Sequence, residues 1–460
     1  MPARTPVLPS SVVVISMFLA VVLAVPSALA QGSRQEPAAA NVRAAIPGPS
    51  QDLLRQIEEI YKDIHANPEL AMQEHRTAGI AAAWLRKQGY EVTEKIGGTG
   101  VVGLLRNGKG ATVLLRADMD ALPMKEDTGL PYASTKVGKG ESGEDVPVAH
   151  SCGHDMHVAW LMGATRILAE NKGAWHGTVM AVFQPAEEIG AGARAMVDDG
   201  MVQRFPKPDI VLGQHVMPNA AGQLGTRTGV MLSMSDSLEV TLFGRGGHGS
   251  SPQSTVDPVV MAAATVMRLQ TITSRELAMT DGAVVTVGAL LAGSSGNIIP
   301  SESLLRLNIR TFDEPVRDRV LASIHRIIDA EAAASGAPKP PAFKEQGRFP
   351  LTINDEVSTR KVVDALNRRG GEPVQEIQPA SASEDFSVFA RAWKVPSVYW
   401  TVGGIDPQTY AKAKSAGRLN EIPSNHSPQF APVIEPTLRV GIDAMLDAAS
   451  VWLTTAPATH

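Results

Sequence analysis

The sequence predicts an α/β fold, in which helices cover both faces of a sheet, with a smaller α+β unit inserted into it. Short apolar runs that alternate with helical patterns are typical of strands buried on both faces. A central segment instead alternates apolar and polar residues, which is typical of strands with one face in solvent. The chain has 460 residues, more than one ordinary core accommodates, so two domains are expected.

Four apolar runs are expected to form the larger sheet, because each is short and lies between turn signals or helical patterns. These strands lie at 112–115, 178–183, 210–212 and 397–400. The helices expected to cover them, from the spacing of their apolar residues, lie at 53–60, 77–87 and 158–168.

The middle of the chain follows a different order of strand, helix, two strands and helix. These elements lie at 238–242, 257–269, 283–290, 304–312 and 316–334. The order is that of a split-βαβ sandwich, and the Pro- and Gly-rich stretch 335–341 predicts a return linker. We therefore expect an inserted domain at 229–343, within a larger domain made of 50–228 and 344–455.

The N-terminus predicts an export signal. Arg4 precedes an apolar run over 12–25, Pro26 ends this run, and the small-x-small pattern at 28–30 predicts cleavage before Gln31. The alternative is an uncleaved membrane anchor. The run is shorter than the roughly 20 apolar residues that a spanning helix needs, so a cleaved signal is favoured.

We therefore expect a signal peptide at 1–30, a loose linker at 31–49, and an exported protein, periplasmic or secreted, without a stable membrane anchor. Cys152 is the only cysteine, so an internal disulfide is excluded. A lone thiol in an oxidising compartment is a liability unless something, such as a metal ion, occupies it.

Charge gives no sign of a nucleic-acid partner. The net charge is -5, and the 42 basic and 47 acidic residues are mixed along the chain without a basic block. This composition is compatible with an enzyme that acts on small molecules.

Polar residues gather directly after the expected strands, at the edge of an open α/β sheet where ligands bind. Three histidines, one thiol and one carboxylate lie within 150–157. The other members are Asp118, Asp120, Glu187, Glu188, His215 and, in a late loop, His426. Each one alone is better explained as a surface or core side chain. Together, in a chain with one cysteine, they predict a metal site.

Glu187 and Glu188 are informative because adjacent side chains project in different directions. One carboxylate can bind a metal ion while its neighbour faces the substrate and passes a proton from the attacking water to the leaving amine. The ligands also outnumber those that one tetrahedral ion uses, so a site for two divalent ions is predicted.

Seven segments resemble the motifs of a known family. They occur in the family's order, and the resemblance covers nearly all of 50–453. They are 116–123 (RADMDALP), 150–155 (HSCGHD), 184–188 (QPAEE), 246–252 (GGHGSSP), 296–300 (GNIIP), 383–386 (SEDF) and 425–428 (NHSP). They are similar to the motifs of the peptidase M20 family, in the amidohydrolase branch that includes hippurate hydrolases, aminoacylases and hydrolases of auxin–amino-acid conjugates.

The resemblance implies a doubly wound metallo-hydrolase domain with an inserted split-βαβ domain that serves as a dimerisation lid. The metal ligands that it implies are Cys152, His154, Glu188, His215 and His426. Glu187 is implied as general base and acid, and Asp120 as the group that orients a ligand histidine. Met156 departs from the pattern, since glycine is frequent there, and we expect this change to shape the pocket.

In the inserted domain, the resemblance implies that His248 and Asn297 meet the substrate carbonyl or carboxylate. His248 is implied to reach the active site of the partner in a homodimer. Arg310 is a candidate for binding the substrate carboxylate, and the alternative for this strand arginine is a structural role.

These roles imply a metal-dependent hydrolase of the amide bond of N-acyl amino acids. One alternative is a metallo-exopeptidase, a carboxypeptidase or dipeptidase that acts on short peptides. An alternative of another class is a non-catalytic exported metal- or peptide-binding protein, which the presence of Glu187 disfavours. Zinc or manganese is expected as the metal, with cobalt or nickel as alternatives. The preferred acyl group and amino acid are not readable from the sequence.

Overall fold

A computed structural model describes residues 38–140 and 142–453. The expected signal peptide at 1–30 and its cleavage point lie outside these residues. Within the described ranges, no helix has the length and apolar character needed to cross a membrane.

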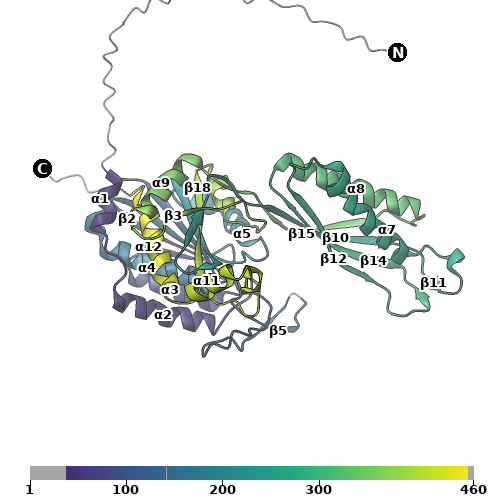
Figure 1. The fold of residues 1–460 in the computed structure, drawn as a ribbon, viewed down its shortest axis with the longest axis horizontal. Helices are drawn as coiled ribbons and strands as arrows, with labels where there is room; N and C mark the ends of the chain where they lie inside the picture. Colours follow the sequence, from purple (N-terminus) through teal and green to yellow (C-terminus); the bar gives the residue numbers. More distant parts are fainter. Residues whose placement is uncertain (1–37, 141, 454–460) are drawn as a thin grey trace, which may run out of the picture. The chain divides into compact units, whose positions relative to one another are not determined.

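A mixed sheet of eight strands forms the centre of the larger domain (Figure 1), which confirms the predicted α/β class. Four parallel strands occupy its middle, in the order β6 (Gly177–Gln184), β3 (Thr112–Asp118), β7 (Ile210–Ala220) and β18 (Ser397–Ile405). Nearly every residue of β3, β6 and β18 is buried, as expected for strands with helices on both faces.

Further strands extend both edges of this sheet. One edge carries the antiparallel pair β1 (Glu91–Ile96) and β2 (Gly100–Asn107), and the other carries β8 (Leu224–Thr226) and β17 (Gln375–Glu376). The sequence analysis did not predict these strands. Half of the residues of β1 are exposed charged ones, Glu91, Glu94 and Lys95, and β8 and β17 are too short to show a pattern.

Helices cover both faces of the sheet. One face carries α2 (Gln51–His65), α3 (His75–Lys87), α4 (His154–Glu170) and α12 (Thr437–Ser450). The opposite face carries α5 (Gly192–Asp198) and α10 (Ser387–Trp393). The remaining helices and strands of this part, apart from short 3-10 turns, are β4 (Val137–Lys139), β5 (Asp145–Pro147), α6 (Met201–Arg204), α9 (Glu356–Asn367), α11 (Pro407–Ser415) and the pair β9 (Gly229–Leu232) and β16 (Thr352–Asn354).

A second sheet of four strands has the order β12-β14-β10-β15, with α7 and α8 packed on it. The elements follow the predicted order: β10 (Met234–Phe243), α7 (Pro258–Thr271), β12 (Ala283–Ala292), β14 (Glu302–Thr311) and α8 (Glu314–Ala334). Asp257 and Asp313 cap α7 and α8 by accepting from Val259 N and Val316 N, as helix N-caps do.

Two expectations about boundaries are wrong. The inserted domain does not end at 343, because β15 (Ala342–Phe349) continues its sheet. This strand is polar and mostly exposed, so it lacks an apolar pattern. The loose linker expected at 31–49 contains α1 (Ala38–Ala45), which buries Val42 and pairs Arg43 with two aspartates of α12.

The contact between α4 and α12 yields a stability prediction. Gly441 of α12 lies against Trp160 of α4, and an added Cβ would lie 2.1 to 2.4 Å from atoms of the indole ring. The ring is held in place because its Nε1 donates to Thr437 O (3.0 Å). We expect Gly441→Ala to lower the free energy of unfolding by about 1–3 kcal/mol through overpacking, measured by urea denaturation.

Gly79 of α3 provides the matched control, since an added Cβ there meets nothing within 4 Å. Gly79→Ala is expected to raise the free energy of unfolding by about 0.5–1 kcal/mol, because alanine favours a helix interior. Stabilisation by both substitutions would contradict the tight contact at Gly441.

Candidate active site

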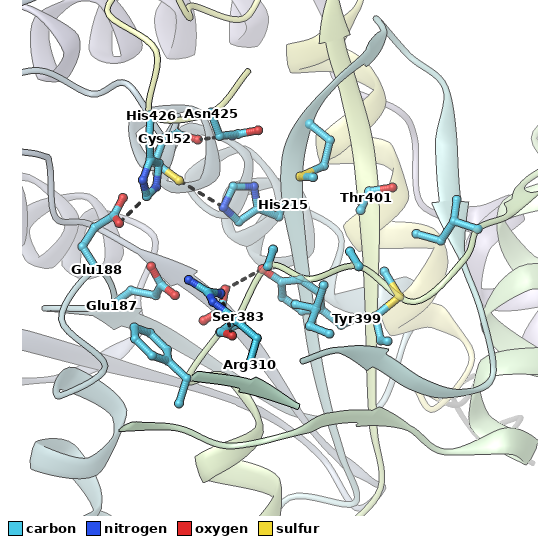
Figure 2. Close-up of a pocket in the computed structure, with 18 of the residues that line it drawn as sticks. Cys152, Glu187, Glu188, His215, Arg310, Ser383, Tyr399, Thr401, Asn425 and His426 are labelled. Carbon is cyan, nitrogen blue, oxygen red and sulfur yellow. Dashed lines mark hydrogen bonds and ion pairs between the residues drawn. The ribbon is translucent and has the colours of Figure 1, made fainter. Parts of the chain in front are cut away.

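The structure brings the five predicted metal ligands together near the carboxyl ends of the central strands. Figure 2 shows Cys152, Glu188, His215 and His426. Cys152 lies in the turn before α4, His154 is the first residue of α4, and Glu188 follows β6. His215 lies inside β7, which is longer than the predicted strand at 210–212, and His426 lies in a loop after α11. The site is therefore assembled from four segments that are far apart in the sequence.

Donor atoms in this cluster lie at contact distance from one another. The Sγ of Cys152 is 3.4 Å from Nε2 of His215, and Nε2 of His426 is 3.2 Å from a carboxylate oxygen of Glu188. Nε2 of His154 lies 3.7 Å from the other oxygen of Glu188. Two compact groups result, Cys152–His154–His215 and Cys152–Glu188–His426, with donor atoms within 4.8 Å of one another.

The state of these atoms fits a bound cation. Nε2 of His154 and Oε1 of Glu188 are buried without a hydrogen-bond partner, which is costly unless a ligand satisfies them. Nδ1 of His215 donates to Val216 O (2.7 Å), which leaves the lone pair of Nε2 directed to the cluster. Thiol, imidazole and carboxylate donors in two overlapping groups are suited to two divalent ions.

The other two histidines of 150–157 do not join either group. Nδ1 of His157 lies 2.5 Å from Asp118, and its Nε2 accepts from Val216 N (2.9 Å). Both nitrogens are thus engaged, and His157 is neutral with its proton on Nδ1. His150 is buried, and burial lowers its pKa to about 4. It belongs to no candidate metal group of the described residues.

Asp120 is placed to hold the cluster. One of its carboxylate oxygens lies 3.4 Å from Nδ1 of His154. The carboxylate also accepts from the backbone N–H groups of Glu187 (3.0 Å) and Glu188 (2.9 Å). Asp120 therefore contacts a candidate ligand and the turn that carries both glutamates.

Glu187 lies beside the cluster and lines the pocket (Figure 2). Its carboxylate is 3.8 Å from Nε2 of His154. Burial, followed by the negative charges of Glu384 and Glu188, raises the pKa of Glu187 well above its usual value. A carboxylate with a raised pKa is a better proton acceptor, which suits a general base that must later return the proton.

Arg116 holds the buried carboxylates beside Glu187 in place, a role that the sequence analysis did not assign. Its guanidinium is buried and contacts Asp118 (2.7 Å), Glu384 (2.6 Å), Asp385 (3.3 Å) and Gln184 (2.8 Å). Burial raises the pKa of Asp385 to about 8, against the opposing charge of Arg116. The motifs at 116–123 and 383–386 thus meet in one buried network.

Asn425 is a second residue without a role in the sequence analysis. Its side-chain amide donates to Cys152 O (2.9 Å) and Val216 O (3.1 Å), and the next residue, His426, has a positive φ of 68°. One amide therefore joins the segments that carry three candidate ligands. A polar residue in a loop gives no sign of such a role before the fold is known.

A pocket of about 450 Å³ opens beside the cluster. Arg310 of β14 lines it together with Cys152, Glu187 and His426 (Figure 2). His248 and Asn297 do not line this pocket. His248 is exposed in the two-residue strand β11 (Gly247–His248), which pairs with β13 (Ile298–Ile299).

The fold and the side-chain cluster define an α/β metallohydrolase with a pocket for a small-molecule substrate. The sequence profile of "Peptidase family M20/M25/M40" matches residues 114–416. The chain therefore belongs to this family and is an enzyme that acts on amide bonds. The resemblance noted in the sequence is confirmed.

Individual relatives are similar over most of their length. A hippurate hydrolase from Campylobacter jejuni is 37% identical over 347 residues, which cover 75% of this chain and 87% of that protein. Thermostable carboxypeptidase 2 of Saccharolobus solfataricus is 35% identical over 390 residues, which cover 84% of this chain and 92% of that protein. A Bacillus subtilis structure described as a dinuclear metal binding peptidase from the M20 family has a TM-score of 0.68 at 26% identity. The match covers 87% of this chain and 99% of that one.

Glu187 and Glu188 have different roles in this site, so we expect their substitution to affect metal content differently. Glu188→Gln is expected to lower the metal bound per chain, because it removes a donor charge from the cluster. Glu187→Gln is expected to keep the metal yet lower kcat by roughly 10²–10⁴, the usual contribution of proton transfer. Metal quantification after dialysis, combined with steady-state kinetics, tests this pair. Loss of metal from Glu187→Gln and its retention in Glu188→Gln would reverse the assignment.

Proposed function

We propose that this enzyme hydrolyses the amide bond of N-acyl amino acids. The observation that carries the proposal is the state of Arg310. Its Nη1 donates to Ser381 O and Ser383 Oγ (both 2.9 Å), and its Nε donates to Asn308 Oδ1 (2.9 Å). Nη2 has no protein partner among the described residues, and no described carboxylate pairs with this guanidinium. A half-buried cation without a counterion favours an anionic ligand, and a substrate carboxylate fits it.

The rest of the pocket wall supports an uncharged acyl group. Away from the cluster it is lined mainly by apolar side chains, Met217, Met231, Leu232, Phe349 and Ile377. Its only other acid is Glu384, which Arg116 and Tyr399 already engage. The ammonium group of a dipeptide would find the uncharged side chains of Asn219, Gln378 and Thr401 along this wall but no free carboxylate, whereas an N-acyl group needs no counterion. A carboxypeptidase activity is the second candidate, because Arg310 would equally bind the terminal carboxylate of a peptide.

In this proposal the substrate carboxylate binds Arg310 and the scissile amide faces Glu187. Bound divalent ions would polarise the scissile carbonyl and the attacking water. Glu187 accepts the proton of that water and donates it to the leaving amine. Zinc or manganese is our proposed metal, since the thiol and imidazoles suit zinc while the carboxylates also accept manganese.

Removal of Arg310 tests the proposed substrate class. A panel of N-acyl amino acids, their C-terminal amides and dipeptides is assayed with the wild type and Arg310→Met, with and without chelator. The wild type is expected to prefer N-acyl amino acids and to lose activity in chelator. Arg310→Met is expected to lower kcat/KM for the acids by roughly 10–100-fold, the value of a hydrogen bond to a charged group, and to leave the amides unchanged.

Arg306 provides the matched control, because it lies on the same strand, is exposed and pairs with Glu239. Arg306→Met should behave as the wild type. A preference for acids over amides that survives in Arg310→Met would contradict the carboxylate role, and a preference for dipeptides would favour the exopeptidase alternative.

We also propose a homodimer formed through the smaller domain. β12 is an edge strand of its sheet, and apolar side chains are exposed on β12 and on α7. They are Val284, Leu290, Leu291, Val259, Val260 and Met267. An unpaired edge with exposed apolar residues supports pairing with a second copy. Nδ1 of His248 accepts from Ser250 N (3.1 Å), so its proton is on Nε2, which suits a donor to a developing oxyanion in the partner.

Mixing inactive variants tests the shared site. His248→Ala is expected to lose roughly 10²–10³ in kcat while it keeps its metal, as when an oxyanion donor is removed. A heterodimer of His248→Ala with Glu187→Gln would hold one site with both residues intact, so activity should reappear on mixing. An inactive mixture, with subunit exchange shown by a tag on one variant, would rule out a site shared between copies.

A further inference from the structure

Glu74 is a buried carboxylate that none of the roles above uses. It is fully buried, and no arginine, lysine or histidine of the described residues forms an ion pair with it. It occupies the N-cap position of α3, yet its side chain makes no capping hydrogen bond. A carboxylate without a counterion is costly to bury, so the contacts that this side chain makes are informative.

The side chain is directed to the turn that carries the two glutamates of the active site. Its Oε1 accepts from Ala186 N (2.8 Å) and Met72 N (2.9 Å), and its Oε2 accepts from the hydroxyl of Thr99. Asp120 accepts from the next two amides, those of Glu187 (3.0 Å) and Glu188 (2.9 Å). Three consecutive N–H groups are thus bound by two buried carboxylates.

This pattern fixes an unfavourable backbone conformation. Ala186 has a φ of +50°, a left-handed conformation that costs a residue with a Cβ roughly 1–2 kcal/mol. The N–H of Ala186 belongs to the peptide plane before its Cα, and the N–H of Glu187 belongs to the plane after it. Glu74 orients the first plane and Asp120 the second, so together they set φ and ψ of Ala186.

We propose that Glu74 is a positioning residue for catalysis, which holds the turn at Ala186 so that the Glu187 carboxylate faces the scissile amide. This inference rests on the proposed role of Glu187 as the proton-transferring group. Glu74 does not touch the substrate or the cluster. It acts through the backbone of Ala186, and a small displacement of a catalytic carboxylate is sufficient to slow a reaction strongly.

Two variants of similar shape separate hydrogen bonding from packing. Glu74→Gln keeps an oxygen that can accept from Ala186 N, whereas Glu74→Met fills similar space without an acceptor. We expect Glu74→Gln to retain kcat and Glu74→Met to lower it by roughly 10–100-fold, the order expected for a displacement of about 1 Å. KM and metal per chain should stay as in the wild type. Glu69→Met is the control, because Glu69 binds Arg76 N and Thr77 N of α3 rather than the turn.

A double-mutant cycle shows whether Glu74 acts through Glu187. The loss caused by Glu74→Met should vanish in a Glu187→Gln background, whereas general destabilisation would lower activity in both backgrounds. Ala186→Gly should restore part of the activity of Glu74→Met, since glycine adopts a positive φ without the Cβ penalty. Equal losses in both backgrounds would overturn the proposal.

Glu74→Asp keeps the test decisive if Glu74→Met does not fold. It retains the charge but shortens the side chain by one methylene, so the carboxylate no longer reaches Ala186 N, and kcat should fall. An unchanged kcat in folded, metal-loaded Glu74→Asp would overturn the inference. Full activity of Glu187→Gln would instead refute the proposed role of Glu187, so failure of that role is distinguishable from failure of the role of Glu74.

Discussion

The guanidinium of Arg116 contacts the carboxylates of Asp118, Glu384 and Asp385 in the buried base of the site. Three carboxylates at this spacing would repel one another in a medium of low dielectric, and a delocalised cation with five N–H donors offsets that repulsion. Asp118 comes from β3, whereas Glu384 and Asp385 precede α10. The contact therefore joins two distant segments of the chain and fixes the surface on which the cluster is built.

Two of the carboxylates that Arg116 contacts, Asp118 and Glu384, also position other groups of the site. Asp118 binds Nδ1 of His157, and the Nε2 of that ring accepts from Val216 N, the residue after His215. Glu384 accepts from the hydroxyl of Tyr399 (2.6 Å) and borders Glu187. The orientation of the candidate ligands thus depends on a chain of hydrogen bonds that starts at the buried guanidinium of Arg116.

The residues of the cluster could be predicted from the sequence, whereas the residues that position them could not. Cys152, Glu188 and His426 are chemically conspicuous, and the edge of an α/β sheet is where side chains that bind a ligand gather. Glu74, Arg116 and Asn425 act through contacts between segments 112 to 273 residues apart. Such pairings depend on the tertiary fold, so no local pattern reveals them. The same reason explains why β15, a polar strand recruited to the edge of its sheet, was missed while the apolar strands β3 and β6 were found.

The balance of charge links the ions to the substrate. The carboxylates of Asp118, Asp120, Glu187, Glu188, Glu384 and Asp385 surround the cluster, and Arg116 is the one guanidinium among these described side chains. Protons offset much of this carboxylate charge in the metal-free site. Burial raises the pKa of Glu187 and of Asp385, and hydrogen bonds to Cys152 and Glu188 raise the pKa of His426. Metal ligands must give up their protons, so two divalent ions would replace protons as the positive charges of the site. Arg310 lines the same pocket as Glu187 and His426, so the ions would also determine the charge that a carboxylate bound to Arg310 meets.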